Sequence, residues 1–159
     1  MTFRRAPALL AFLVVLSSCS QYLGAVDLHD LQSDPASQLR MPATDLLGQG
    51  GKDRTLTPDG PSMAFYGGVF GTQASKEEVL AFYERELTKL GWTRYNRGVN
   101  QSTTDLRVDG WCKPRVTFRL AIVDQDRFAP RFDSSGRRYS TIFNADLVGV
   151  DSGEKCPGR

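Results

Sequence analysis

The chain has 159 residues, of which 20 are Lys or Arg and 18 are Asp or Glu, so its formal net charge is only +2. A chain of this length supports one domain around a single core. So small a net charge lacks the strong basic field on which nucleic-acid binding depends, and we expect no nucleic-acid partner.

Residues 1–18 have the three parts of an export signal. Arg4 and Arg5 form a positive start, an apolar run follows over residues 8–16, and small residues come after it. The run is too short for the hydrocarbon core of a bilayer, which takes about 20 residues in a helix. We therefore predict a signal peptide that is cut off, and not a membrane-spanning anchor.

The end of this signal, Leu16-Ser17-Ser18-Cys19, resembles the lipobox of bacterial lipoproteins, in which a Leu precedes two small residues and a Cys. The resemblance implies that the thiol of Cys19 carries a diacylglyceryl group and that cleavage occurs just before it. Two or three acyl chains then hold the protein firmly, because each buried methylene contributes about 0.8 kcal/mol. The expected partner of the N-terminus is a membrane.

The same resemblance predicts a location on the extracytoplasmic side of the cell envelope. Ser20, and not an Asp, follows the cysteine. Among sorted lipoproteins of bacteria with two membranes, this favours the outer membrane. In a host with one membrane, the anchor is expected on the outer face of the cytoplasmic membrane. Cleavage removes two of the 20 basic residues and leaves 18 against 18 acidic ones, so the mature chain is formally neutral.

Residues 19–62 are predicted to be the lipidated N-terminus and a flexible tether. Residues 22–31 suit a short helix, but residues 33–61 are rich in Pro, Gly, Asp, Ser and Thr and have too little apolar surface to bury. As a coil, this segment would span on the order of 30 Å. The alternative is a loosely ordered loop wrapped on the domain.

A single domain is predicted over residues 63–159, starting with a buried strand over residues 63–70. The helix that follows has clear ends, because Ser75 and Glu78 form a capping box and Gly91 stands where a left-handed C-cap belongs. An apolar stripe at helical spacing is typical of a core face. Its members are Val79, Leu80, Tyr83, Leu87 and Leu90.

Beyond this helix, apolar residues recur at every second position, which is typical of half-buried strands. Strands are predicted over residues 92–98, 103–111, 115–124 and 139–150. In the last strand, we expect Tyr139 on the same face as Phe143 and Leu147. The order β-α-β-β-β-β predicts an α+β fold, with one helix packed on a largely antiparallel sheet of about five strands.

The two remaining cysteines, Cys112 and Cys156, are predicted to form a disulfide, since an exported chain reaches a compartment that permits one. If the last two strands pair as a hairpin, the start of the first lies beside the end of the second. Cys112 precedes the first of these strands and Cys156 follows the second. The alternative is two unpaired thiols.

No pattern points to a catalytic residue, a cofactor or a metal. The only histidine, His29, lies in the predicted tether, so the domain offers neither a Ser-His-Asp arrangement nor a His-based zinc site. Residues 67–71 are glycine-rich but match no phosphate-binding fingerprint, and we predict a tight turn there. Asp124, Asp126 and Asp133 lack the spacing of a calcium loop and are predicted to be solvated.

The connection between the last two predicted strands is the first candidate site. It is longer than the loops of about 2–5 residues that usually join a hairpin. It is rich in arginine and aromatic residues, which are enriched at interface hot spots. These residues are Arg127, Phe128, Arg131, Phe132, Arg137 and Arg138. One hypothesis is a contact loop for a protein, glycan or lipid head group. The other is that Phe128 and Phe132 cap the core.

A polar face of the sheet is the second candidate. Its residues are Arg115, Thr117, Arg119, Asn144 and Asp146. If nothing covers this face, they line a shallow site. Otherwise the face is simply solvated, and Arg119 and Asp146 form a surface ion pair of little energetic weight.

The helix ending in Leu90-Gly91-Trp92 is similar to short domains of uncharacterised bacterial lipoproteins over residues 64–95, a resemblance that implies no activity. The sequence thus favours a non-enzymatic envelope lipoprotein whose domain binds or positions another envelope component, a protein or a glycan. One alternative is a carboxylate-dependent hydrolase of wall or surface polymers. Another is a small-ligand carrier with a pocket near Tyr66, Tyr83 and Phe143.

Overall fold

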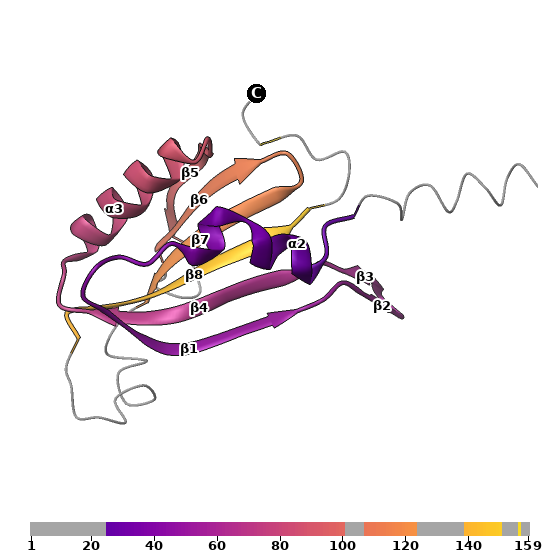
Figure 1. Cartoon of the computed structure of the whole chain (residues 1–159), viewed down its shortest axis with the longest axis horizontal. Helices are drawn as coiled ribbons and strands as arrows, with labels where there is room; N and C mark the ends of the chain where they lie inside the picture. Colours follow the sequence, from indigo (N-terminus) through magenta and orange to yellow (C-terminus); the bar gives the residue numbers. More distant parts are fainter. Residues whose placement is uncertain (1–24, 101–106, 124–138, 151–155, 157–159) are drawn as a thin grey trace, which may run out of the picture.

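A computed structural model describes residues 25–100, 107–123 and 139–150 together with Cys156, and its main feature is a six-stranded antiparallel sheet (Figure 1). In spatial order, the strands are β1 (Thr44–Lys52), β4 (Phe65–Thr72), β8 (Thr141–Gly149), β7 (Val116–Val123), β6 (Arg107–Lys113) and β5 (Thr93–Asn100). A short hairpin of β2 (Thr55–Thr57) and β3 (Gly60–Ser62) projects beyond the β1–β4 pair.

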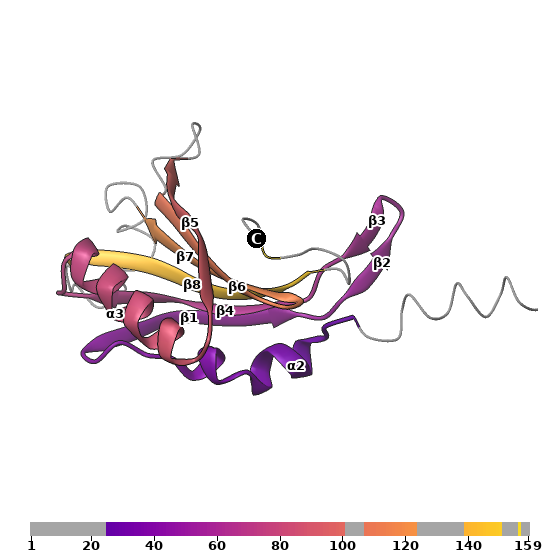
Figure 2. The same cartoon turned by 90° about the horizontal axis from the view of Figure 1, so that it is seen from above.

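The helices lie on one face of this sheet (Figure 2). They are α2 (Leu28–Ser33), the 3-10 helix η1 (Pro35–Gln38) and α3 (Lys76–Lys89). Within the described residues, none of them is long and apolar enough to cross a membrane. The opposite face carries no helix of the described chain.

Helix α3 begins and ends as predicted. The hydroxyl of Ser75 accepts the amide of Glu78, and the carboxylate of Glu78 accepts the amide of Ser75, which satisfies two amides that the helix leaves unpaired. Gly91 follows with a φ of 79°, a left-handed conformation that costs glycine little. Val79, Tyr83 and Leu87 are buried against the sheet.

The core lies between this helical layer and the sheet. Alternate residues of β7 and β8 point inward and are buried, namely Phe118, Leu120, Ile122, Phe143, Ala145 and Leu147. The ring of Tyr83 on α3 lies 5.5 Å from that of Phe118 and 5.7 Å from that of Phe143. Phe143 in turn stacks on Phe70 of β4 at 5.4 Å. Aromatic packing of this kind fixes the helix on the sheet.

The predicted tether is wrong for the part of it that the structure describes, and the predicted domain start at residue 63 is too late. Leu31 of α2 and Ala36 of η1 are buried in the core. Strand β1 pairs with β4 from Thr44 opposite Thr72 to Lys52 opposite Phe65. The sequence of β1 is polar and glycine-rich and has few side chains to bury. Strand pairing, however, uses the backbone N–H and C=O groups, and every residue except proline has both.

The predicted α+β class and antiparallel sheet are confirmed, with β1 as the additional strand. The last two strands pair as a hairpin, from Val116 opposite Gly149 to Val123 opposite Ile142. The disulfide between Cys112 and Cys156 is also present, with 5.8 Å between the two Cα atoms. It joins the chain after β8 to β6, on the far side of β7.

Candidate functional site

The sheet face opposite the helices, which we call the outer face, carries four of the five residues predicted for a polar sheet face. Thr117 and Arg119 on β7, and Asn144 and Asp146 on β8, alternate with the buried residues of the core. Arg119 stands directly opposite Asp146 in the ladder. These four residues thus lie on one face of the sheet, and their role as a binding site stays a prediction.

Arg115 lies outside this group. It precedes β7, in the turn after β6, with a φ of 71° in the left-handed region. Its carbonyl accepts the amide of Val150, and its Nε is buried without a hydrogen-bond partner in the described chain. Because the backbone leaves the extended conformation here, the alternation that orients Thr117 does not continue to Arg115.

Asp146 is the chemically most distinctive residue of the outer face. Its Oδ2 accepts the side-chain amide of Asn144 at 2.7 Å and lies 3.7 Å from Nη2 of Arg119. Burial raises the pKa of Asp146, while the charge of Arg119 and the Asn144 hydrogen bond oppose that rise. The result is a partly buried carboxylate beside an exposed guanidinium, a pair that can accept from and donate to polar groups such as hydroxyls and amides.

Glycines make room for the larger groups of this face. A Cβ on Gly67 would collide with the Asp146 carboxylate, and one on Gly71 would collide with the ring of Tyr139. The hydroxyl of Tyr139 donates to Oδ2 of Asp45 on β1 at 3.0 Å. Tyr139 thus lies on the outer face, and not beside Phe143 as predicted.

The tight turn predicted over residues 67–71 is likewise wrong, because these residues lie inside β4. Glycine serves there for close approach and not for chain reversal. The sequence signal that points to this role is the placement of Gly67 two positions before Val69 and Gly71 two positions after it, on one face of a strand.

A second polar cluster lies at the edge of the helical layer. Arg94 on β5 pairs with the fully buried Asp109 of β6 and with Glu84 of α3, whose Oε2 is 2.5 Å from Nη1. Its guanidinium also stacks over the ring of Trp111 at 5.2 Å. A carboxylate-dependent hydrolase needs two carboxyl groups roughly 5–9 Å apart on either side of an accessible bond. Here one arginine holds both carboxylates, so this cluster docks α3 and does not favour that alternative.

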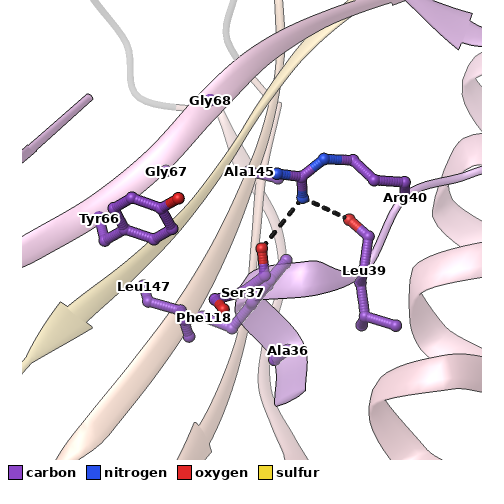
Figure 3. A pocket seen from close by; sticks show the side chains of 10 residues that line it. All are labelled: Ala36, Ser37, Leu39, Arg40, Tyr66, Gly67, Gly68, Phe118, Ala145 and Leu147. Atoms are coloured by element: carbon purple, nitrogen blue, oxygen red, sulfur yellow. Dashed lines mark hydrogen bonds between the residues drawn. The ribbon is translucent and has the colours of Figure 1, made fainter. Parts of the chain in front are cut away.

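The space between η1 and the sheet contains a small hollow beside Arg40 (Figure 3). Arg40 donates to the carbonyls of Ser37 and Leu39 and lies over the ring of Phe70. The hollow measures about 10 Å³, which is room for one water molecule. Since aromatic rings fill the layer next to it, the structure does not favour a ligand carrier with a pocket between helix and sheet.

The predicted contact loop lies outside the described residues, as do Asp124, Asp126 and Asp133. The residues that flank the loop, Val123 and Tyr139, belong to one end of the β7–β8 hairpin. His29 is exposed on α2. Among the residues that the structure describes, no three His, Cys, Asp or Glu side chains gather closely enough to hold a metal.

The fold is that of an α+β protein whose described helices all lie on one side of the sheet. No protein-family model, no curated protein and no solved structure matches the chain.

Proposed function

We propose that the protein is a lipid-anchored lipoprotein of the cell envelope whose domain binds or positions another envelope component without catalysis. The proposal rests on one observation: the N-terminal segment and the connection after β7 lie at opposite ends of the sheet. The chain enters the domain at one end, whereas the long connection after β7 leaves from the other.

Val26 marks the first end. It contacts Gly149, at the end of β8, and Gly149 pairs with Val116 at the start of β7. The contact loop begins after Val123, at the opposite end of the same hairpin. Seven residue steps of a strand separate the two ends by about 23 Å. An anchor at Cys19 therefore turns the residues that flank the loop away from the membrane.

The chemistry of the loop suits a partner. Phe128 and Phe132 supply apolar contact area, and arginines such as Arg131 and Arg137 supply bidentate donors for carboxylates, phosphates or sugar hydroxyls. Tyr139 of the outer face lies at the same end of the β7–β8 hairpin, directly after the loop. A protein or a glycan of the envelope is the proposed partner, in the outer membrane if the host has two membranes and at the cytoplasmic membrane's outer face if it has one.

The anchor is tested by expressing Cys19→Ala in the native host and separating membranes from soluble fractions. The wild type is expected to incorporate labelled fatty acid and to sediment with membranes, and Cys19→Ala to do neither. Membrane association of the variant at the wild-type level would refute the lipid anchor.

The partner is tested by cross-linking intact envelopes that contain the chain with Phe128, Arg131, Phe132 and Arg137 replaced by Ala. The expected result is loss of the cross-linked species that the wild type gives. A matched control replaces exposed residues of α3, Lys76 and Glu77, by Ala and keeps those species. Recovery of the same species at the same yield by the loop variant would rule out this loop as the interface.

A further inference from the structure

Large exposed apolar side chains cluster at one place in the described chain. The exposed fraction is 70% for Leu56 in β2, 39% for Met63 in the link after β3, and 40% for Phe65 at the start of β4. Leu46, which is 51% exposed, lies elsewhere, near the beginning of β1. Single exposed apolar residues are ordinary on a protein surface, whereas a contiguous group indicates a contact site.

The three side chains belong to one short stretch of the chain, residues 56–65. Leu56 is paired with Pro61 across the hairpin, and Met63 and Phe65 follow Pro61 at every second position. Ala64, between Met63 and Phe65, is buried. We call Leu56, Met63 and Phe65 the apolar end patch.

The β2–β3 hairpin, which carries Leu56, projects at the end of the sheet where the chain enters the domain (Figures 1 and 2). A groove of about 480 Å³ separates Ala25 and Val26 from residues 53–56 of the hairpin. The amide of Leu28 donates to the carboxylate of Asp53 at 3.1 Å, which joins the start of α2 to the base of the hairpin. The hairpin and the N-terminal segment therefore share one end of the molecule.

The reach of the chain limits how far this end lies from a lipidated Cys19. Six residue steps separate Cys19 from Ala25. Even fully extended, they span about 21 Å at most. That is shorter than the roughly 40–45 Å thickness of a whole bilayer with its head groups. The apolar end patch is thus kept close to the membrane for as long as the anchor is inserted.

We propose that the apolar end patch rests in the lipid bilayer surface beside the anchor and sets the orientation of the domain on the membrane. This inference rests on the lipid anchor of the proposed function. The bilayer is the occupant that the geometry favours, because the anchor keeps it within a short reach of the patch. The charges around the hairpin balance, with Lys52 and Arg54 against Asp53 and Asp59, so apolar contact and not lipid charge drives the docking.

The test places a tryptophan in the patch of the lipidated protein, as Leu56→Trp, and reconstitutes it in phosphatidylcholine vesicles with or without bromine on the acyl chains. Bromine quenches indole only on close contact. The native Trp92 and Trp111 are buried in the core and supply a constant background. The matched control is Leu46→Trp, an exposed leucine of β1 that lies far from the hairpin.

We expect brominated lipid to reduce the added emission of Leu56→Trp at least about twofold and to leave that of Leu46→Trp unchanged, since apolar side chains enter the bilayer boundary by about 5–10 Å. Protein that floats with the vesicles while Leu56→Trp stays unquenched would overturn the patch contact and leave the anchor standing. Protein that neither carries lipid nor floats would overturn both.

A second copy of the chain is the competing occupant, and sedimentation of the soluble Cys19→Ala form detects it. We expect a monomer. A dimer that Leu56→Asp converts to monomer would assign the patch to self-association and overturn the membrane contact. Because Leu56 is mostly exposed, Leu56→Asp leaves the core intact, and thermal unfolding of the variant checks this.

Discussion

Tyr83 offers the sharpest test of the packing between α3 and the sheet. Its side chain is fully buried, and its hydroxyl has no hydrogen-bond partner in the described chain. An unsatisfied buried polar group costs roughly 1–3 kcal/mol. Tyr83→Phe removes that group and keeps the ring contacts with Phe118 and Phe143. We therefore expect the substitution to raise the free energy of unfolding by about 1 kcal/mol.

The assay is urea unfolding of the purified Cys19→Ala form, followed by tryptophan fluorescence. Tyr139→Phe is the matched control, since its hydroxyl donates to Asp45 and its loss is expected to lower the free energy of unfolding by about 1 kcal/mol. The two tyrosines thus give opposite signs for the same chemical change. A Tyr83→Phe protein that is less stable than its parent would refute the reasoning, because the hydroxyl would then have a partner.

The pH dependence of the free energy of unfolding gives a second test of the burial of Tyr83. Burial raises the pKa of Tyr83 above its usual value near 10, and the charge of Arg40 offsets this only in part. Above pH 10, the unfolded chain loses this proton while the folded chain keeps it, so stability falls as pH rises. One such group contributes up to about 1.4 kcal/mol per pH unit. Subtracting the Tyr83→Phe profile from the wild-type profile is expected to isolate this slope, and equal profiles would contradict it.

Three further predictions concern the outer face and its disulfide. Cys156→Ser opens a loop with a sequence separation of 44 and is expected to cost about 4 kcal/mol in urea unfolding; no change with or without reductant would argue against the bridge. Gly67→Ala forces a methyl group into the Asp146 carboxylate and is expected to cost about 1–3 kcal/mol, whereas Gly50→Ala, with open space around it, is the tolerated control. Asp146→Asn is expected to gain stability relative to wild type as pH rises above 4, because burial raises the pKa of this carboxyl and charging it costs energy; a parallel pH profile would refute this.

The accuracy of the sequence-based predictions followed the range of the interactions involved. The ends of α3 were predictable because Ser75, Glu78 and Gly91 act within one turn of the helix. The inward faces of β7 and β8 were predictable because alternation depends on neighbouring residues only. Arg115 was placed on the wrong face because a turn interrupts the strand before it. The spacing of polar and apolar residues does not indicate this turn, in which Arg115 has a left-handed conformation.

The candidate site was predictable in part for the same reason. That Thr117, Arg119, Asn144 and Asp146 share a face followed from two strands that pair as a hairpin. The contacts of this face with β1 and β4 were not predictable, because they join residues far apart in the chain. Tyr139 bonds to Asp45 across 94 positions, and no local spacing signals that pair.

The sequence by itself determined the capped helix, the alternating strands and the cysteine pair, because each depends on short-range geometry or on a count. Only the tertiary structure decided that residues 25–62 join the domain and that the chain makes no turn at Gly67 and Gly71. The physical reason is that backbone hydrogen bonds to β4 hold β1 in the sheet. Such bonds do not depend on which side chains β1 carries, so its composition does not reveal them. The glycines are likewise explained by groups of other strands and loops, Asp146 and Tyr139, which only the folded sheet brings to them.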